Sequence, residues 1–260
     1  MLPFRSIKSL YPIALAEGEG VGTAYEYFAK RLVLARWLAK LPRVRRLIIA
    51  GLPEKYGSSL DFLLIAQEMG VAEVVVVDER PPALDKIRKS VAAAQAVGEL
   101  TPLQPHYVLA ADMARLVELS GIFDLCLGSE VLQRLDRVRR QQYVERLVQL
   151  APALGLFAPN ADDPAHTNLS GLSGLRLTEL QDLVKPTGMP ARTGYVDMPP
   201  FPPGLNRSAE QRSRATTGRL EALAMRMLHQ YARLERHFPL GWRRGHAHIV
   251  YALIPKSGAF

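Results

Sequence analysis

Short apolar runs alternate with segments of helical spacing along the first 160 residues. The apolar runs cover residues 46–51, 73–78, 106–112, 122–128 and 153–160. Between them, apolar side chains recur at intervals of three and four residues, which predicts helices over 59–69, 83–97 and 136–151. An earlier helical pattern over 21–40 stops at Pro42, and a short helix is predicted after 112. Strands alternating with helices predict an α/β fold with a mostly parallel, doubly wound sheet and helices on both faces.

The pattern changes after residue 160. The turn-rich stretch NADDPAHTNLSGLSG predicts a loop, which is followed by a helix over 176–184 and a strand over 191–198. A proline-rich break then precedes a long helix over 205–238, where Ser208 and Gln211 have the spacing of a capping box. A strand over 247–255 completes the pattern. Residues 1–20 show too little periodicity to predict an element.

Length and composition fit one large domain. The chain has 260 residues, of which 48% are hydrophobic. No apolar run approaches the roughly 18 residues needed to cross a bilayer, and no signal peptide is evident. Cys126 is the only cysteine and lies within an apolar run. It is therefore expected to be a small buried side chain, and a cytoplasmic location is the expectation.

The net charge of +8 permits an acidic partner but does not require one. Arginines recur every seven residues along the predicted long helix, at Arg219, Arg226 and Arg233. Another face of that helix carries the apolar residues Leu220, Leu223, Met227, Tyr231 and Leu234. The arginine stripe is compatible with RNA binding or with an ordinary solvated helix face.

The residues that follow each strand are the candidate binding residues, because ligands of open α/β sheets lie beyond the carboxyl ends of the strands. The first strand leads into GLPEKYGSS, residues 51–59. Gly57 would allow close approach of a ligand, and the next helix would offer free N–H groups to a carboxylate or phosphate. An ordinary turn between strand and helix is the alternative, since the spacing is not that of a dinucleotide-binding glycine motif.

The following strands end in polar residues. Asp78 ends the second strand, 21 residues after Gly57, and suits a carboxylate that accepts hydrogen bonds from ribose hydroxyls; Glu79 is a second candidate. Asp112 follows the third strand and could accept a hydrogen bond from an adenine amino group, or could only cap a helix. Gly128, Ser129 and Glu130 follow the fourth strand. They could form the floor of a pocket, or Ser129 could be a cap.

Taken together, these strand ends give the chain, from about residue 17 to 255, a resemblance to class I S-adenosylmethionine-dependent methyltransferases. The resemblance implies that the first loop wraps the methionine part of the cofactor, through Gly51, Pro53, Glu54, Gly57 and Ser58. It also implies that Asp78 or Glu79 holds the ribose, that Asp112 and Met113 meet the adenine, and that FDLCLGSEVLQRLD (123–136) borders the site of methyl transfer. The family's sheet has seven strands and ends with an antiparallel pair, which the strands at 191–198 and 247–255 match.

Two departures from the family concern the first loop. Ala50 stands where an acidic residue usually precedes the first glycine, and G-L-P-E-K-Y-G replaces the usual G-x-G-x-G. Glu54 could supply the missing carboxylate to the amino group of the cofactor.

The N-terminal segment EGEGVGTAYEYFAKR supplies candidates for a lid. In the family such segments fold over cofactor and substrate, so Glu19, Gly22, Thr23 and Tyr27 could line the site; alternatively, Thr23 is a helix cap and the tyrosines are core. His166 is the one histidine considered as a general base. No metal site is predicted, and no catalytic residue is assigned, because methyl transfer can proceed largely by positioning.

The sequence therefore predicts a cytoplasmic methyltransferase that uses S-adenosylmethionine, with a small-molecule acceptor favoured. It is expected to be one domain, with an N-terminal lid (1–42), a cofactor-binding core (43–160) and a C-terminal part (161–260). Three alternatives stay open: a methyltransferase fold kept as a binding module without turnover, an RNA methyltransferase using the basic face, and an NAD-dependent oxidoreductase. No membrane partner is expected.

Overall fold

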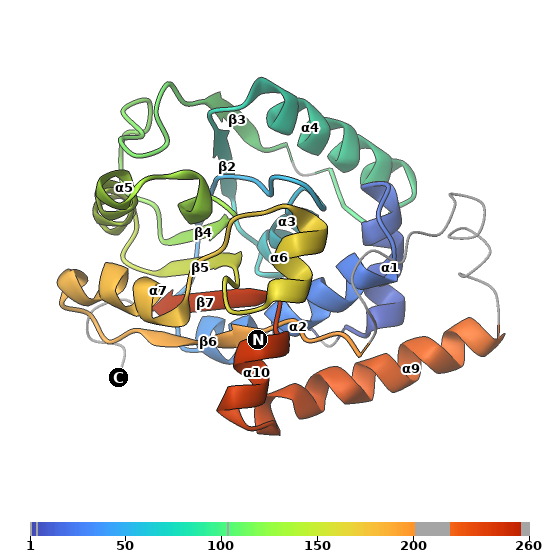
Figure 1. Cartoon of the computed structure of the whole chain (residues 1–260). Helices are drawn as coiled ribbons and strands as arrows, with labels where there is room; N and C mark the ends of the chain where they lie inside the picture. The colour runs from blue at the N-terminus through green and yellow to red at the C-terminus, as the bar shows by residue number, and fades with distance from the viewer. Residues whose placement is uncertain (1, 4, 103, 201–218, 256–260) are drawn as a thin grey trace.

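The computed structural model describes residues 2–3, 5–102, 104–200 and 219–255. Seven strands form one sheet in the order β3-β2-β1-β4-β5-β7-β6 (Figure 1). The strands are β1 (Arg46–Ala50), β2 (Glu73–Asp78), β3 (His106–Leu109), β4 (Leu125–Ser129), β5 (Leu154–Pro159), β6 (Arg192–Val196) and β7 (Ile249–Ile254). The first five pair in parallel, and β7 runs antiparallel to both of its neighbours, β5 and β6. The sequence-based fold prediction is confirmed.

Helices cover both faces of the sheet (Figure 1). One face carries α1 (Ile7–Ala16), α2 (Val21–Leu38), α3 (Leu60–Glu68), α4 (Pro81–Ala96) and α9 (Arg219–Leu234), and the other carries α5 (Arg137–Leu150) and α7 (Leu177–Val184). Alternate strand residues supply the two cores: Leu47 and Ile49 lie in one, and Ile48 lies in the other. This follows from the two-residue period of a strand buried on both sides.

Three of the α-helices in the described part of the chain were not predicted. Helix α1 begins at a capping box formed by Ser6 and Ser9 and buries Ile7, Leu10 and Ile13, although Pro12 lies inside it. The predicted loop after β5 contains α6 (Pro164–Ser170), and α10 (Leu240–His246) precedes β7. The short helix predicted after β3 is wrong, since that stretch forms only turns.

The long C-terminal helix is described from residue 219, so the predicted capping box at Ser208 lies outside the described residues. In α9 the side chains that pack inward include Met225 and Ala232. Three of the residues predicted to share an apolar face, Leu223, Met227 and Leu234, are more than half exposed. Their shared stripe therefore faces away from α1 and α2, the helices against which α9 packs.

Candidate functional site

Polar side chains from several strands meet at the carboxyl edge of the sheet. Asp78 is the last residue of β2, and Glu130 follows β4 directly. Asp163 lies beyond the end of β5, and Asp197 follows β6. His248 also belongs to this edge, because β7 is antiparallel and therefore begins where its neighbours end. The topology thus gathers one histidine and four carboxylates that are far apart in the sequence.

The first loop is shaped by close packing at its two glycines. Gly51 has a φ of +83°, and a Cβ there would lie 1.9 Å from Cγ2 of Val131. Gly57 has a φ of +68°, and a Cβ there would lie 3.1 Å from both Oε2 of Glu17 and the hydroxyl of Tyr27. Both positions suit glycine because of conformation and contact. The atoms that approach these two glycines so closely belong to other side chains of the protein.

Glu17 covers the start of α3. Its Oε1 accepts hydrogen bonds from the backbone N–H of Ser58 (3.1 Å), the hydroxyl of Ser58 (2.7 Å) and the N–H of Leu60 (3.0 Å), and its Oε2 accepts one from Tyr27. The expectation that this helix start offers free N–H groups to a ligand is therefore wrong for these two groups. A buried carboxylate of the chain binds there, as the positive end of a helix dipole favours.

The pKa of Glu17 is raised from 4.5 to about 7 by burial, and the hydrogen bonds from Tyr27, Ser58 and Leu60 offset this only in part. The folded protein therefore holds the proton more tightly than the unfolded chain, so this group makes stability fall as pH rises from about 4.5 to 7. We expect Glu17→Gln to remove this part of the pH dependence, on the order of 2 kcal/mol. Urea unfolding at pH 5, 6, 7 and 8 measures it.

The matched control for that substitution is Glu145→Gln, at an exposed site on α5. Glu26 and Glu235 also have raised pKa values and add to the wild-type slope. The informative quantity is therefore the difference between variant and wild type at each pH. An identical slope in the Glu17 variant would contradict the assignment.

Asp78 is fully buried and bound on both carboxylate oxygens. Its Oδ1 accepts from Nε of Arg80 at 2.8 Å, and its Oδ2 accepts from the same guanidinium at 2.9 Å. Oδ2 also accepts from the N–H of Leu52 at 2.9 Å and lies 3.5 Å from Arg134. Burial alone would raise the pKa of Asp78, but these donors and charges outweigh it and lower the pKa. The carboxylate is ionised, and the guanidinium of Arg80 covers both of its oxygens.

Asp112 and its neighbours lie next to Asp78, because β3 pairs with β2. Oδ1 of Asp112 accepts from Arg139 at 2.7 Å and from the N–H of Ala114 at 2.8 Å. Met113 is fully buried, and Glu79 lies 3.4 Å from its N–H. Asp112 is thus a turn residue in an exposed ion pair rather than a helix cap.

The residues at the end of β4 and directly after it lie either in the interior of the protein or at the carboxyl edge of the sheet. Gly128 is buried where a Cβ would lie 2.8 Å from the carbonyl oxygen of Ala50, and Ser129 is also buried. Glu130 reaches the first loop, where its Oε2 accepts from the N–H of Glu54 at 2.8 Å. Of the candidates on this stretch, Glu130 is the one whose carboxylate contacts the first loop.

The N-terminal segment contacts the first loop. Oε1 of Glu19 accepts from the N–H of Gly57 at 3.1 Å and lies 3.7 Å from Lys86. Thr23 packs beside Gly57, while Gly22 has open space around it. The N-cap of α2 is Gly20, so the alternative role of Thr23 as a cap is excluded. Pro53 in the same loop is half-buried.

A buried ion pair beside the first loop was not found from sequence. Nζ of Lys30 lies 2.9 Å from Asp61 and 3.0 Å from Glu26, and the Lys30 side chain is 1% exposed. The ammonium also lies over the ring of Phe62, 4.7 Å from its centroid. Both the negative charges and the ring favour the charged lysine, whose pKa is raised although burial opposes it. The sequence offered one signal of this buried ion pair, which is that Lys30 is a charged residue on the apolar face of a predicted helix.

His166 pairs with His248. Their rings stack with centroids 4.3 Å apart. Burial and the neighbouring His248 lower the pKa of His166 to about 4. Burial also lowers the pKa of His248, but Asp197, which lies 3.1 Å from Nδ1 of His248, raises it by more. Of the two rings, His248 is therefore the one that holds a proton more readily.

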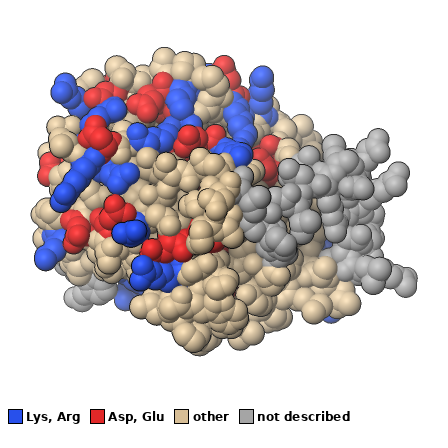
Figure 2. Space-filling view, viewed as in Figure 1, with Lys and Arg blue, Asp and Glu red and all other residues tan. Residues whose placement is uncertain are grey.

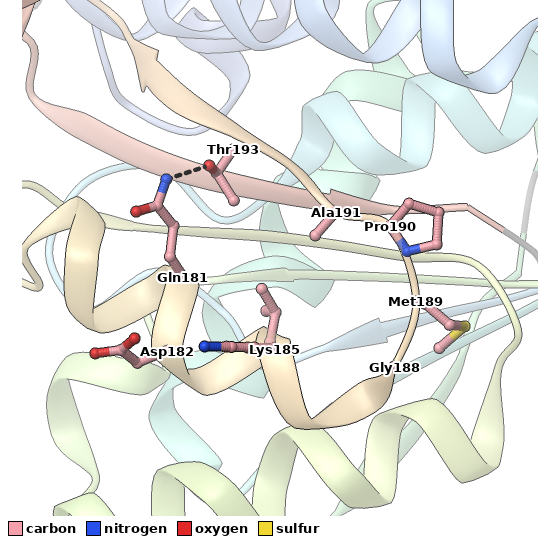
Figure 3. A pocket seen from close by; sticks show the side chains of 9 residues that line it. Gln181, Asp182, Lys185, Gly188, Met189, Pro190, Ala191 and Thr193 are labelled. Carbon is pink, nitrogen blue, oxygen red and sulfur yellow. Dashed lines mark hydrogen bonds between the residues drawn. The ribbon is translucent and has the colours of Figure 1, made fainter.

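A hollow of about 580 Å³ lies elsewhere, between α7 and the start of β6 (Figure 3). Its lining includes Gln181, which donates a 2.9 Å hydrogen bond to Thr193, and the side chains of Lys185 and Met189. Arg192 at the start of β6 pairs with Leu253, near the end of β7. The hollow therefore lies at the amino edge of the sheet, opposite the candidate site.

Two kinds of feature are missing from the described part of the chain. Within it, no group of three or more His, Cys, Asp or Glu side chains is arranged to hold a metal ion. None of its helices combines the length and the apolar character needed to span a membrane. Cys126 is buried, and burial raises the pKa of its thiol, as expected for a packing residue.

No protein-family model matches the sequence, and no curated protein matches it either. Among solved structures, a SAM-dependent methyltransferase from Archaeoglobus fulgidus aligns with a TM-score of 0.52 and 12% identity, covering 86% of this chain and 92% of that one. The plantazolicin methyltransferase BpumL in complex with SAH aligns with a TM-score of 0.50 and 15% identity, covering 96% and 97%. The chain has the fold of class I S-adenosylmethionine-dependent methyltransferases.

Proposed function

We propose that the protein is an S-adenosylmethionine-dependent methyltransferase acting on a small molecule. The observation that carries the proposal is the placement of Asp78 and Asp112 at the carboxyl ends of adjacent strands, in a sheet of the methyltransferase order. These are the positions from which the family holds ribose and adenine. The cofactor, when bound, supplies a methyl group on a sulfonium, which is primed for attack by a nucleophile.

The residues present fit the adenosine part of the cofactor better than its methionine part. Asp78 is ionised and needs only the release of Arg80, whose side chain is 27% exposed, to accept from ribose hydroxyls. The start of α3 is already covered by Glu17, so the methionine carboxylate would need another partner. The methionine amino group would have two carboxylates available, those of Glu54 and Glu130.

Within this proposal the first loop, Gly51, Pro53, Gly57 and Ser58, would surround the methionine part. Met113 and Glu79 would border the adenine and ribose, and Gly128 and Ser129 would form the floor of the site. Glu19, Gly22, Thr23 and Tyr27 would belong to the lid, as part of a single domain made of segments 1–42, 43–160 and 161–260.

A small-molecule acceptor is favoured over RNA by the distribution of charge. Figure 2 shows basic and acidic side chains next to one another in the upper and left parts of the face seen in Figure 1, whereas its lower part is mostly uncharged. An RNA-binding face is expected to present clustered lysine and arginine. At the candidate site itself, the side chains gathered from the strand ends are mostly carboxylates, which repel phosphate.

A binding module without turnover is the second candidate, and one observation favours it. The chain's own side chains, Glu17 on the start of α3 and Arg80 on Asp78, occupy positions where a cofactor is held in the family. If these contacts persist in solution, the fold would be retained without cofactor binding.

Calorimetric titration of the purified protein with S-adenosylmethionine, S-adenosylhomocysteine and NAD separates these possibilities. We expect the first two to bind with dissociation constants in the micromolar range, about −8 kcal/mol, and NAD not to bind. Binding of NAD alone would instead indicate an oxidoreductase. Binding of none of the three would contradict the methyltransferase proposal and favour the module without turnover.

A further inference from the structure

We propose that the methyl acceptor is an amine that binds in its ammonium form to a cluster of carboxylates between α2 and the strand ends of β4, β5 and β6. Before transfer the ammonium gives one proton to a carboxylate of the cluster. The nitrogen lone pair then forms the N–C bond as the S–C bond of the cofactor breaks and S-adenosylhomocysteine leaves. This inference rests on the proposed methyltransferase function and names its substrate class. The acidic cluster is defined by Glu26, Glu130, Asp163 and Asp197.

The four carboxylates converge from four separate elements. Glu26 lies on α2, and Glu130 follows β4. Asp163 caps α6 beyond the end of β5, and Asp197 follows β6. His248 joins two of them, since its ring nitrogens lie 3.1 Å from Asp197 and 4.0 Å from Asp163.

The charges of Asp197 and Glu130 act on Glu26. The pKa of Glu26 is raised to about 8, first by burial and further by the charges of Asp197 and Glu130. Burial raises the pKa of Glu130 as well. The Glu26 side chain nevertheless keeps 20% of its surface exposed. Part of this carboxylate is therefore accessible from solvent.

Four positive charges lie nearby. Lys30 is held between Asp61 and Glu26, and His248 is bonded to Asp197. Arg134, whose charge lowers the pKa of Glu130, lies 3.5 Å from Asp78, and Lys55 donates to the carbonyl oxygen of Ser170. Among the described residues, only Lys30 and His248 form ion pairs with the four carboxylates, so an added positive charge would be stabilised there.

Asp197 provides an independent sign of a missing donor. Its side chain is 6% exposed, and its Oδ1 has no hydrogen-bond partner among the residues the structure describes. Nδ1 of His166, whose ring stacks on His248, is likewise without a partner in the described parts of the chain. A buried acceptor without a donor costs about 1–3 kcal/mol. An ammonium group brings three donors and a positive charge, and so matches the unpartnered oxygen of Asp197.

Other ligand chemistries fit the cluster less well. Phosphate or carboxylate groups would be repelled by the excess of negative charge. A metal ion would need a set of ligands that the described residues do not offer. A neutral alcohol could donate one hydrogen bond but would leave the charge uncompensated.

The test measures binding of matched amines and alcohols to the full chain without cofactor. The probes are butylamine and butan-1-ol, benzylamine and benzyl alcohol, and putrescine and butane-1,4-diol, each titrated by calorimetry. We expect at least one amine to bind about tenfold or more tightly than its alcohol, as one charge-assisted hydrogen bond allows. Because the amine would favour ionised Glu26, binding should release protons, seen as a dependence of the binding enthalpy on the buffer.

The variants Asp197→Asn and Glu26→Gln should each remove this preference. Asn keeps the shape of Asp197 and tolerates its φ of +69°, so the variant is expected to fold. Glu145→Gln, at an exposed site on α5, is the matched control and should bind as the wild type does. The proposal is overturned if no amine binds more tightly than its alcohol, or if the preference survives in both cluster variants while circular dichroism shows them folded.

A separate titration with S-adenosylhomocysteine keeps the two proposals distinguishable. Binding of S-adenosylhomocysteine without any amine preference would overturn the substrate class and leave the methyltransferase proposal standing. An amine preference without binding of S-adenosylhomocysteine would overturn the methyltransferase proposal. The cluster would then be an amine-binding site of a protein that does not transfer methyl groups.

Discussion

Replacement of Asp78 by Asn should abolish measurable binding of S-adenosylhomocysteine while the protein stays folded. The ionised carboxylate would accept hydrogen bonds from ribose hydroxyls, and hydrogen bonds to charged groups contribute about 1.5–3 kcal/mol each. Two such bonds correspond to a loss of affinity of about 100-fold or more. Asn keeps one oxygen, which can accept from the N–H of Leu52, while the backbone N–H of Arg80 loses the acceptor that it has in Oδ1.

The matched control is Asp85→Asn, which removes the same charge from an exposed position on the following helix. The opposite change is Arg80→Ala, which removes the guanidinium from both oxygens of Asp78, leaves their backbone N–H donors in place, and should strengthen binding. Calorimetry gives the affinities and circular dichroism gives the fold. Unchanged affinity in a folded Asp78→Asn protein would remove Asp78 from the proposed site.

Lys30→Met should destabilise the protein by about 3–5 kcal/mol, because removing one partner leaves buried negative charge without compensation. Lys30 is 1% exposed and lies 2.9 Å from Asp61, whose side chain is 4% exposed. The aliphatic part of methionine fills similar space, so loss of the charge dominates over loss of packing. The free energy of unfolding in urea is the measurement.

A double variant tests whether the loss of stability comes from the carboxylate that Lys30 no longer neutralises. Adding Asp61→Asn to Lys30→Met removes the uncompensated carboxylate, and most of the stability should return. Lys89→Met, at an exposed position on α4, is the control and should change stability by less than about 0.5 kcal/mol. A single Lys30 variant as stable as that control would show that the pair is neutral to folding.

The strands and the helices between them could be predicted from the sequence because their patterns are local. A run of apolar residues such as EVVVVD directly predicts a strand that is buried on both of its faces. Helix α1 gave no such signal, since Pro12 interrupts it and its inward residues are held by contacts with distant helices. Helix α6 lies within a stretch rich in turn formers, and its cap, Asp163, also resembles a turn residue.

The candidate site could be predicted only where one residue follows one strand. Asp78, Asp112 and Glu130 were found in this way. Glu17 was not, because its role depends on α1 and α2 bringing the segment between them onto the start of α3. Asp197 is likewise recognisable only once β6 is placed beside β7. Contacts between residues so far apart in the chain produce no periodic pattern in the sequence.

The position of β7 governs the order in which the sheet can be completed. β7 lies between β5 and β6, yet it is the last strand to be synthesised. While the chain is still on the ribosome, β5 therefore has an open edge, and β6 has no strand beside it until residues 249–254 emerge. Such an edge is prone to pair with other chains. The N-terminal five strands can form early, whereas Asp197 and His248 are brought together only after β7 has been synthesised and has paired with β6.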